Sequence, residues 1–178
     1  KKYGADILRT WVAASDYSED LRLDHSILEQ HAESYRKIRN TFRFILGNLK
    51  DKKINFDLKS KKTEKWPELE RYMLHQIFAL NKKFEKYFKE YNLHKLYKEL
   101  LNFCSLDLSA FYFDIRKDIL YCDEEKSPRR QICTNFLGLI LDILLKWFAP
   151  ILSFTTEEIF QIINVKNTSV HLENFPKI

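Results

Sequence analysis

The chain places three arginines within eight residues, at Arg36, Arg39 and Arg43. If this segment is a helix, their side chains fall within about 60° of each other at 100° per residue, with Asn40 beside them. A guanidinium is a planar fork of donors that fits phosphates and guanine edges, and an asparagine amide can pair with a base edge. The spacing therefore predicts a nucleic-acid-binding face. The alternative is that the arginines are only the solvated flank of a core helix.

The same segment carries an apolar stripe that must position this face. Its members recur at helical spacing: Tyr35, Ile38, Phe42, Ile45 and Leu49. Phe44 lies off this stripe, on the side of Lys37 and Asn40. It could stack on an unstacked base, or it could pack against a neighbouring helix.

Further helices are expected on both sides of this segment. Apolar periodicity and helix-start signals predict them over residues 5–14, from Ser26 to about Gly47–Asn48, from Pro67 to about Tyr91, from Asn92 to Phe103, over 111–119, 129–148 and 155–163. Ser26 with Glu29 and Thr155 with Glu158 have capping-box spacing. A break is expected at 105–109 and a surface loop at 51–65, with short extended pieces at 19–23 and 169–173. The fold class is all-α, an antiparallel helical bundle with one or two short extended segments.

Composition is that of a globular, helical protein. The chain has 178 residues, 45% hydrophobic and 31% charged, with only 3 glycines and 4 prolines. The formal net charge of +5 favours an anionic partner. The 3 cysteines have no zinc-ribbon spacing and suit a reducing cytosol. The most hydrophobic stretch, 136–152, is interrupted by Asp142, Lys146 and Pro150, which indicates a buried helix rather than a membrane span, and no signal peptide is visible.

No catalytic or metal-binding constellation stands out. The sequence contains no glycine-rich phosphate loop, no His-Glu-x-x-His and no nucleophile elbow, and its 5 histidines are isolated. We therefore expect no catalytic residue, metal site or bound cofactor in this chain, and a binding role instead.

The segment from Tyr35 to Phe44, followed by Leu46-Gly47-Asn48-Leu49, resembles the signature of isoleucyl-tRNA synthetases at the start of their helical anticodon-binding domain. Other landmarks of that family follow in the same order. They are Tyr3 to Arg9 with Trp11 to Ala13, Asp16-Tyr17 with Asp20 to Arg22, Phe103 to Tyr121, Ala149 to Glu158, and Ser169 to Pro176. Several are shared with the valine and leucine enzymes, whereas Lys37 to Thr41 resembles the isoleucine enzyme specifically.

The resemblance implies that the chain grips the anticodon arm of tRNA(Ile). The residues it assigns to RNA contact are Arg36, Lys37, Arg39, Asn40, Thr41, Arg43 and Phe44, with Arg129 and Arg130 as further candidates. For the two further arginines, a structural pairing with Asp118 or Asp123 is the alternative. A valyl-type enzyme and a helical scaffold with a solubilising basic face are the rival functions.

The resemblance also implies a much longer, cytoplasmic, monomeric parent enzyme that joins isoleucine to tRNA. Its ATP-binding motifs and its C-terminal zinc region are absent from these residues, so we expect the chain alone to be inactive. Residues 1–25 would follow the catalytic domain of the same polypeptide and contact the tRNA stem. Residues 26–165 would form the bundle, and 166–178 an extended C-terminal segment.

Overall fold

A computed structural model describes residues 3–21, 24–49, 66–163 and 168–176. Its elements are α1 (Ala5–Ala14), α2 (His25–Leu49), α3 (Glu68–Lys89), α4 (Leu93–Asn102), the π-helix η3 (Phe103–Phe113), α5 (Asp114–Cys122), α6 (Pro128–Phe148), α7 (Ser153–Ile163) and the 3₁₀ turn η4 (Val170–Leu172). Most of the predicted helices are confirmed. The predicted loop at 51–65 lies outside the described residues.

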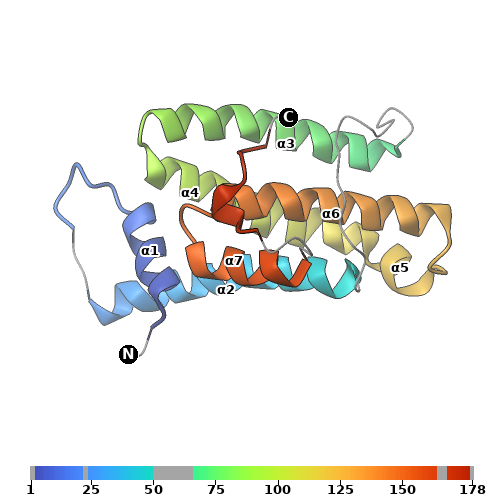
Figure 1. Ribbon diagram of the computed structural model, residues 1–178, viewed down its shortest axis with the longest axis horizontal. Coiled ribbons are helices and arrows are strands. Elements are labelled where there is room, and N and C mark those ends of the chain that lie inside the picture. Colours follow the sequence, from blue (N-terminus) through green and yellow to red (C-terminus); the bar gives the residue numbers. More distant parts are fainter. Residues whose placement is uncertain (1–2, 22–23, 50–65, 164–167, 177–178) are drawn as a thin grey trace.

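The long helices form an antiparallel bundle, as predicted. Successive rods α2, α3, α4–η3–α5 and α6 run in alternating directions, and α1 crosses one end of α2 (Figure 1). Helix α6 lies in the middle and packs against α2, α3, α5 and α7. By length and composition α6 could cross a membrane, but 72% of its most apolar window is buried inside the bundle. It is the core helix that the sequence predicted.

The predicted break at residues 105–109 is wrong, because the chain stays helical from α4 through η3 into α5. In η3 the backbone winds more widely, as a π-helix. The Ser109 hydroxyl donates to the carbonyl of Cys104, five residues earlier, at 2.8 Å. A π-helix turns by less than about 100° per residue, so the α-helical spacing of apolar residues does not apply in this segment. The polar Ser105 and Asp107 then resemble a break in the helix.

Asp24, not Ser26, caps the start of α2. The Oδ1 of Asp24 accepts from the backbone N–H of Ile27 at 2.8 Å and from the Ser26 hydroxyl at 2.8 Å. These two hydrogen bonds hold the pKa of the Asp24 carboxyl below its usual value. Because Asp24 takes the cap position, the helix begins at His25, one residue before the start that the capping-box spacing suggested.

Helix α1 caps the α6–α7 junction with two opposite charges. The buried Asp6 carboxylate accepts from the backbone N–H and the hydroxyl of Thr155, at 2.8 and 2.6 Å, at the start of α7. Arg9 donates to the carbonyls of Pro150 and Ile151, at 2.6 and 2.9 Å, just after α6 ends. An anion at a helix N-terminus and a cation at a C-terminus both complement the helix dipoles. The predicted Thr155–Glu158 capping box is therefore wrong, since α7 begins at Ser153.

Replacing Asp6 by alanine should lower the free energy of unfolding by about 1–3 kcal/mol, because it leaves the buried backbone N–H of Thr155 without its acceptor. The measurement is urea unfolding followed by circular dichroism. Asp20→Ala removes the same carboxylate at an exposed position and should change stability by less than about 0.5 kcal/mol. Equal losses in the two variants would contradict the capping role.

Neither predicted extended piece forms a strand in the part of the chain that is described. Residues 19–21 are irregular, and 22–23 lie outside the described ranges. Within 169–173 the chain makes the turn η4, because Glu157 accepts from the Ser169 hydroxyl and the Val170 N–H, both at 2.9 Å. Beyond η4, Phe175 packs edge-on against Phe84 at a centroid distance of 5.1 Å. This contact ties the C-terminal segment to α3.

Candidate nucleic-acid interface

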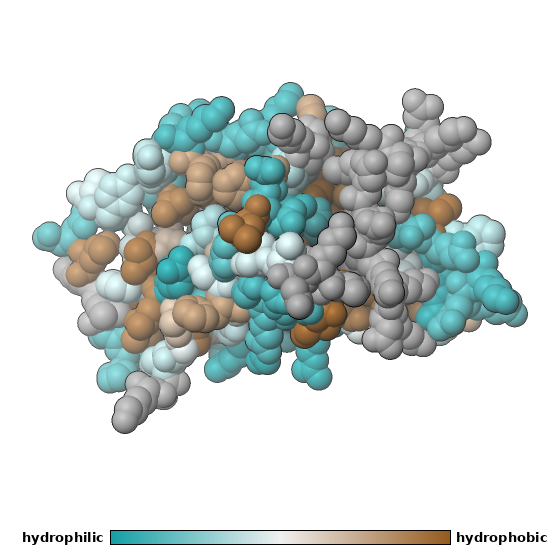
Figure 2. Space-filling model, in the orientation of Figure 1, coloured by the Kyte–Doolittle hydropathy of each residue, from teal (hydrophilic) through white to brown (hydrophobic). Residues whose placement is uncertain are grey.

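The arginine face forms as the sequence predicted. Ile38, Phe42 and Ile45 are at most 1% exposed and pack into the core. The opposite side of α2 carries the exposed side chains Arg36, Lys37, Arg39, Asn40 and Arg43. Figure 2 shows hydrophilic side chains along the edge of the molecule where α2 runs. We call these five residues the α2 face.

Most cations of the α2 face are free to bind an external anion. The guanidinium of Arg36 donates to the Glu33 carboxylate, one turn earlier, and both side chains are largely exposed. Such a surface pair contributes little and exchanges readily. Among the described residues, none forms a hydrogen bond or an ion pair with the side-chain cations of Lys37, Arg39 or Arg43. The bundle itself therefore does not use these three charges.

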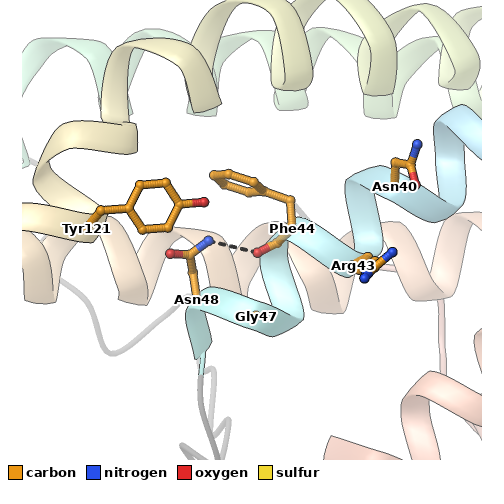
Figure 3. A pocket seen from close by; sticks show the side chains of 6 residues that line it. All are labelled: Asn40, Arg43, Phe44, Gly47, Asn48 and Tyr121. Atoms are coloured by element: carbon orange, nitrogen blue, oxygen red, sulfur yellow. Dashed lines mark hydrogen bonds between the residues drawn. The ribbon is translucent and has the colours of Figure 1, made fainter.

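A groove adjoins the α2 face where α2 approaches α5. It is open to solvent, has a volume of about 350 Å³, and is lined by Asn40, Arg43, Phe44, Gly47, Asn48 and Tyr121 (Figure 3). The Nδ2 of Asn48 donates to the carbonyl of Phe44 at 2.9 Å, which fixes the amide at the groove wall. The groove thus combines amide groups, two aromatic rings and a guanidinium.

Phe44 packs against a neighbouring helix. Its ring stacks on Phe113 at a centroid distance of 4.3 Å and an interplanar angle of 15°. Tyr121 meets it edge-on at 6.4 Å. The packing alternative is therefore confirmed, although the half-buried ring still lines the groove.

Tyr121 lines the groove although it is not among the RNA-contact residues predicted from the sequence. It is 63% exposed, and it lies beside Phe44 of α2 because α5 and α2 both pack on α6. The sequence offers one weak signal, an aromatic residue that follows Ile119 and Leu120 without sharing their apolar stripe. Gly47 and Asn48 also line the groove and were read only as the end of α2.

Thr41 is turned into the bundle. It is 1% exposed, and its hydroxyl lies 3.4 Å from the carbonyl of Cys104 and 3.2 Å from the Ser109 hydroxyl. These bonds fasten α2 to η3. The expected RNA contact of Thr41 does not fit this placement, because a buried and hydrogen-bonded hydroxyl is not accessible to a ligand. Thr41 is therefore left out of the interface proposed below.

The two arginines at the start of α6 have different surroundings. Arg130 is half-buried and donates to the backbone carbonyl of Asp123 at 2.5 Å, which closes the α5–α6 turn. The structural alternative for Arg130 is thus supported, with a carbonyl instead of a carboxylate as the acceptor. Arg129 is exposed. Neither residue lines the groove.

The sequence pattern of one protein family matches most of this fold. Residues 70–178, from α3 to the C-terminal segment, match the family described as the anticodon-binding domain of tRNA ligase. The chain belongs to this family. The matched range of the anticodon-binding domain includes Tyr121 and Arg129, whereas α2 with its arginines precedes it.

Relatives extend the similarity of this anticodon-binding domain to α2. The isoleucine–tRNA ligase of Pelagibacter ubique is 65% identical over 177 residues, which cover 99% of this chain. Those of Brachyspira hyodysenteriae and Mesorhizobium japonicum are 44% and 42% identical and cover 99% and 100% of it. The chain spans about a fifth of the length of these three relatives, at 20%, 19% and 18%.

Proposed function

We propose that the α2 face and the adjoining groove bind the anticodon arm of an isoleucine tRNA. The observation that carries this proposal is the set of exposed cations on α2, Lys37, Arg39 and Arg43, which have no partner among the described residues. The name of the matched family and the names of the relatives support the choice of ligand. Affinity would come mainly from phosphate neutralisation, and specificity from unstacked loop bases.

The chain would then serve as the positioning part of a longer isoleucine–tRNA ligase. That enzyme would use ATP in its catalytic domain, while this domain places the tRNA so that its acceptor end reaches the distant active site. Leu8 and Val12 on α1 are 44% and 57% exposed and offer an apolar surface for contact with the rest of the polypeptide. We expect the parent to be a cytoplasmic monomer.

Zinc and ATP would be held outside this domain. In the described ranges, no three His, Cys, Asp or Glu side chains are grouped so that they could bind a metal ion. The chain sequence also contains neither of the family's ATP-site motifs. What this domain supplies is therefore binding and orientation of the RNA.

Two rival functions are less well supported. The relatives named above are isoleucine enzymes, which disfavours a valyl-type parent. A scaffold with a solubilising coat would spread its charge evenly, whereas α2 concentrates arginines on one side. Binding of isoleucine tRNA and of a non-cognate tRNA to the 178-residue chain, measured over a range of salt concentrations, separates these alternatives.

Binding of tRNA should weaken steeply as the salt concentration rises. If the domain neutralises ~3–5 phosphates, log K should fall by roughly 0.7–0.9 per phosphate for each unit of log salt.

Arg39→Ala and Arg43→Ala should each cost about 1–3 kcal/mol of binding free energy if the side chain forms a two-pronged hydrogen bond to a base, and less if it contacts only phosphate. Their melting temperatures should hardly change, because both side chains are exposed.

Arg71→Ala is the matched control, since Arg71 is an exposed arginine on α3, on the far side of the bundle from α2 (Figure 1). It should leave tRNA affinity nearly unchanged. Salt-insensitive binding, or equal losses for Arg71 and the α2 arginines, would overturn the proposed interface. Early melting of the α2 variants with normal binding by the folded fraction would make these arginines structural.

A further inference from the structure

We propose that the groove between α2 and α5 holds one unstacked nucleobase of the bound RNA, with Gly47 as its bare floor and Tyr121 as its aromatic wall. This inference rests on the proposed function, and it names which part of the RNA enters this site and which residues receive it.

The fold itself does not explain the glycine at position 47. Gly47 is exposed, and a Cβ built on it would meet nothing within 4 Å among the residues that the structure describes. None of the described glycines has a positive φ, so Gly47 is not the left-handed residue that commonly ends a helix. The helix continues past it to Leu49.

Alanine at this position would make α2 more stable, since glycine is among the weakest helix formers. Within the described part of the chain, neither close packing nor unusual backbone geometry accounts for the glycine. Close approach of a ligand to the helix backbone is the reason that remains. A flat ring lying against Gly47 would occupy the space that a Cβ takes in other residues.

The groove wall has the chemistry of a base site. Tyr121 offers a ring that is 63% exposed, and Phe44 is held in place by its stack on Phe113. The Asn48 amide nitrogen is engaged by the Phe44 carbonyl, and its oxygen faces the Tyr121 side of the groove (Figure 3). Rings that stack and amides that read an edge are the usual means of binding a splayed base.

Charge favours a nucleotide over an aromatic side chain of a protein as the occupant. Arg43 stands at the rim of the groove and Asn40 beside it. A guanidinium that lines the groove can bind the phosphate of a nucleotide whose base lies in it. The open side of the groove also suits a base that remains attached to its strand.

The test uses the 178-residue chain and an RNA hairpin with the stem and loop of the isoleucine anticodon arm. Gly47→Ala, and the bulkier Gly47→Gln, should raise the melting temperature by about 2–4 °C, because the helix gains a better helix former. The same variants should weaken hairpin binding by roughly fivefold or more, the low end of a lost base contact. Ala79→Gln is the matched control, since it adds a similar side chain at an exposed position of α3, and it should leave binding unchanged.

A second arm identifies the base. Tyr121→Ala should weaken hairpin binding by roughly 5- to 150-fold, the range for one stacked base, whereas Tyr121→Phe keeps the ring and should bind nearly as the wild type does. Hairpins with an abasic nucleotide at one loop position in turn are then compared. At one position the abasic hairpin should bind the wild type and Tyr121→Ala equally, because the base that the ring contacts is missing.

The outcomes separate the two proposals. If Arg43→Ala weakens binding but the Gly47 and Tyr121 variants do not, the groove is not a base site, and the α2 face remains the RNA contact. If Tyr121→Ala is equally harmful with every abasic hairpin, no single base occupies the groove, and the inference is wrong. If the wild-type chain binds no hairpin even at low salt, both the proposed function and this inference fail.

Discussion

Replacing Glu70 by alanine is expected to cost about 3–5 kcal/mol of unfolding free energy. Glu70 is fully buried, and its carboxylate accepts a two-pronged ion pair from Arg116, at 2.8 Å from Nε and 2.7 Å from Nη2. The Tyr112 hydroxyl donates to the same carboxylate at 2.9 Å. The variant would leave a largely buried guanidinium without its anion. Urea unfolding of the two proteins measures the difference.

The protonation states of the groups around Glu70 support Arg116 as the cation paired with the Glu70 carboxylate. Burial and the neighbouring Glu70 carboxylate raise the pKa of Tyr112 far above its usual range, so its hydroxyl stays a donor. The pKa of the Cys133 thiol rises to about 11, chiefly through burial. Both groups are therefore neutral near pH 7, and Arg116 is the cation that balances Glu70.

Two controls isolate the buried pair. Glu99→Ala breaks the exposed 3.0 Å pair with Lys83 and should cost about 0–1 kcal/mol. The double variant Glu70→Met with Arg116→Leu removes both charges together and should recover most of the loss, because no unpaired charge remains. A single Glu70 variant as stable as the wild type would contradict a structural role for this network.

Phe42→Ala is the second variant with a large expected effect, about 3–5 kcal/mol of unfolding free energy. The Phe42 ring is 1% exposed and meets Phe148 of the core helix edge-on at a centroid distance of 6.0 Å. Its removal leaves a cavity between α2 and α6. The measurement is thermal melting of the variant alongside its tRNA affinity at a temperature where it is folded.

The neighbouring Arg43→Ala is the natural comparison for Phe42→Ala. The two residues are neighbours on α2, but Phe42→Ala should lose stability and Arg43→Ala should lose tRNA affinity. Folded Phe42→Ala should bind tRNA almost as tightly as the wild type. If it binds weakly while fully folded, the α2 face depends on core packing more than the structure indicates.

The helices could be predicted from the sequence because the spacing of apolar residues indicates which side of each helix is buried. The stripe of Ile38, Phe42 and Ile45 predicted both the buried side of α2 and the direction of its arginines. The apolar run in α6 likewise predicted the core helix. In each case the information lies within one helix, where spacing of 3 or 4 residues maps directly onto a face.

Features that depend on two distant segments were not predictable in this way. Asp6 caps a helix that begins 147 residues later, and no local pattern connects them. Thr41 is different, because at 100° per residue it lies within about 60° of Ile38 and Ile45 and on the other side of α2 from the arginines. Its assignment to the RNA contact came from the family resemblance and not from its position on the helix. Tyr121 belongs to the groove only because α5 and α2 both pack on α6. Ser26 and Glu29 do have the spacing of a capping box, but Asp24 accepts the hydrogen bond at the start of α2 instead.

The wide winding of η3 has a consequence for how this domain tolerates changes in length. An α-helix turns by about 100° per residue, so the angular position of Tyr121 is set by the number of residues and the winding between it and α4. A one-residue deletion in η3 that restored α-helical winding would rotate α5 and carry Tyr121 away from Gly47. The sequence predicts a break at residues 105–109, but the π-helix 103–113 that contains them acts as an angular spacer. Length variation among related domains should therefore collect in loops and be rare here.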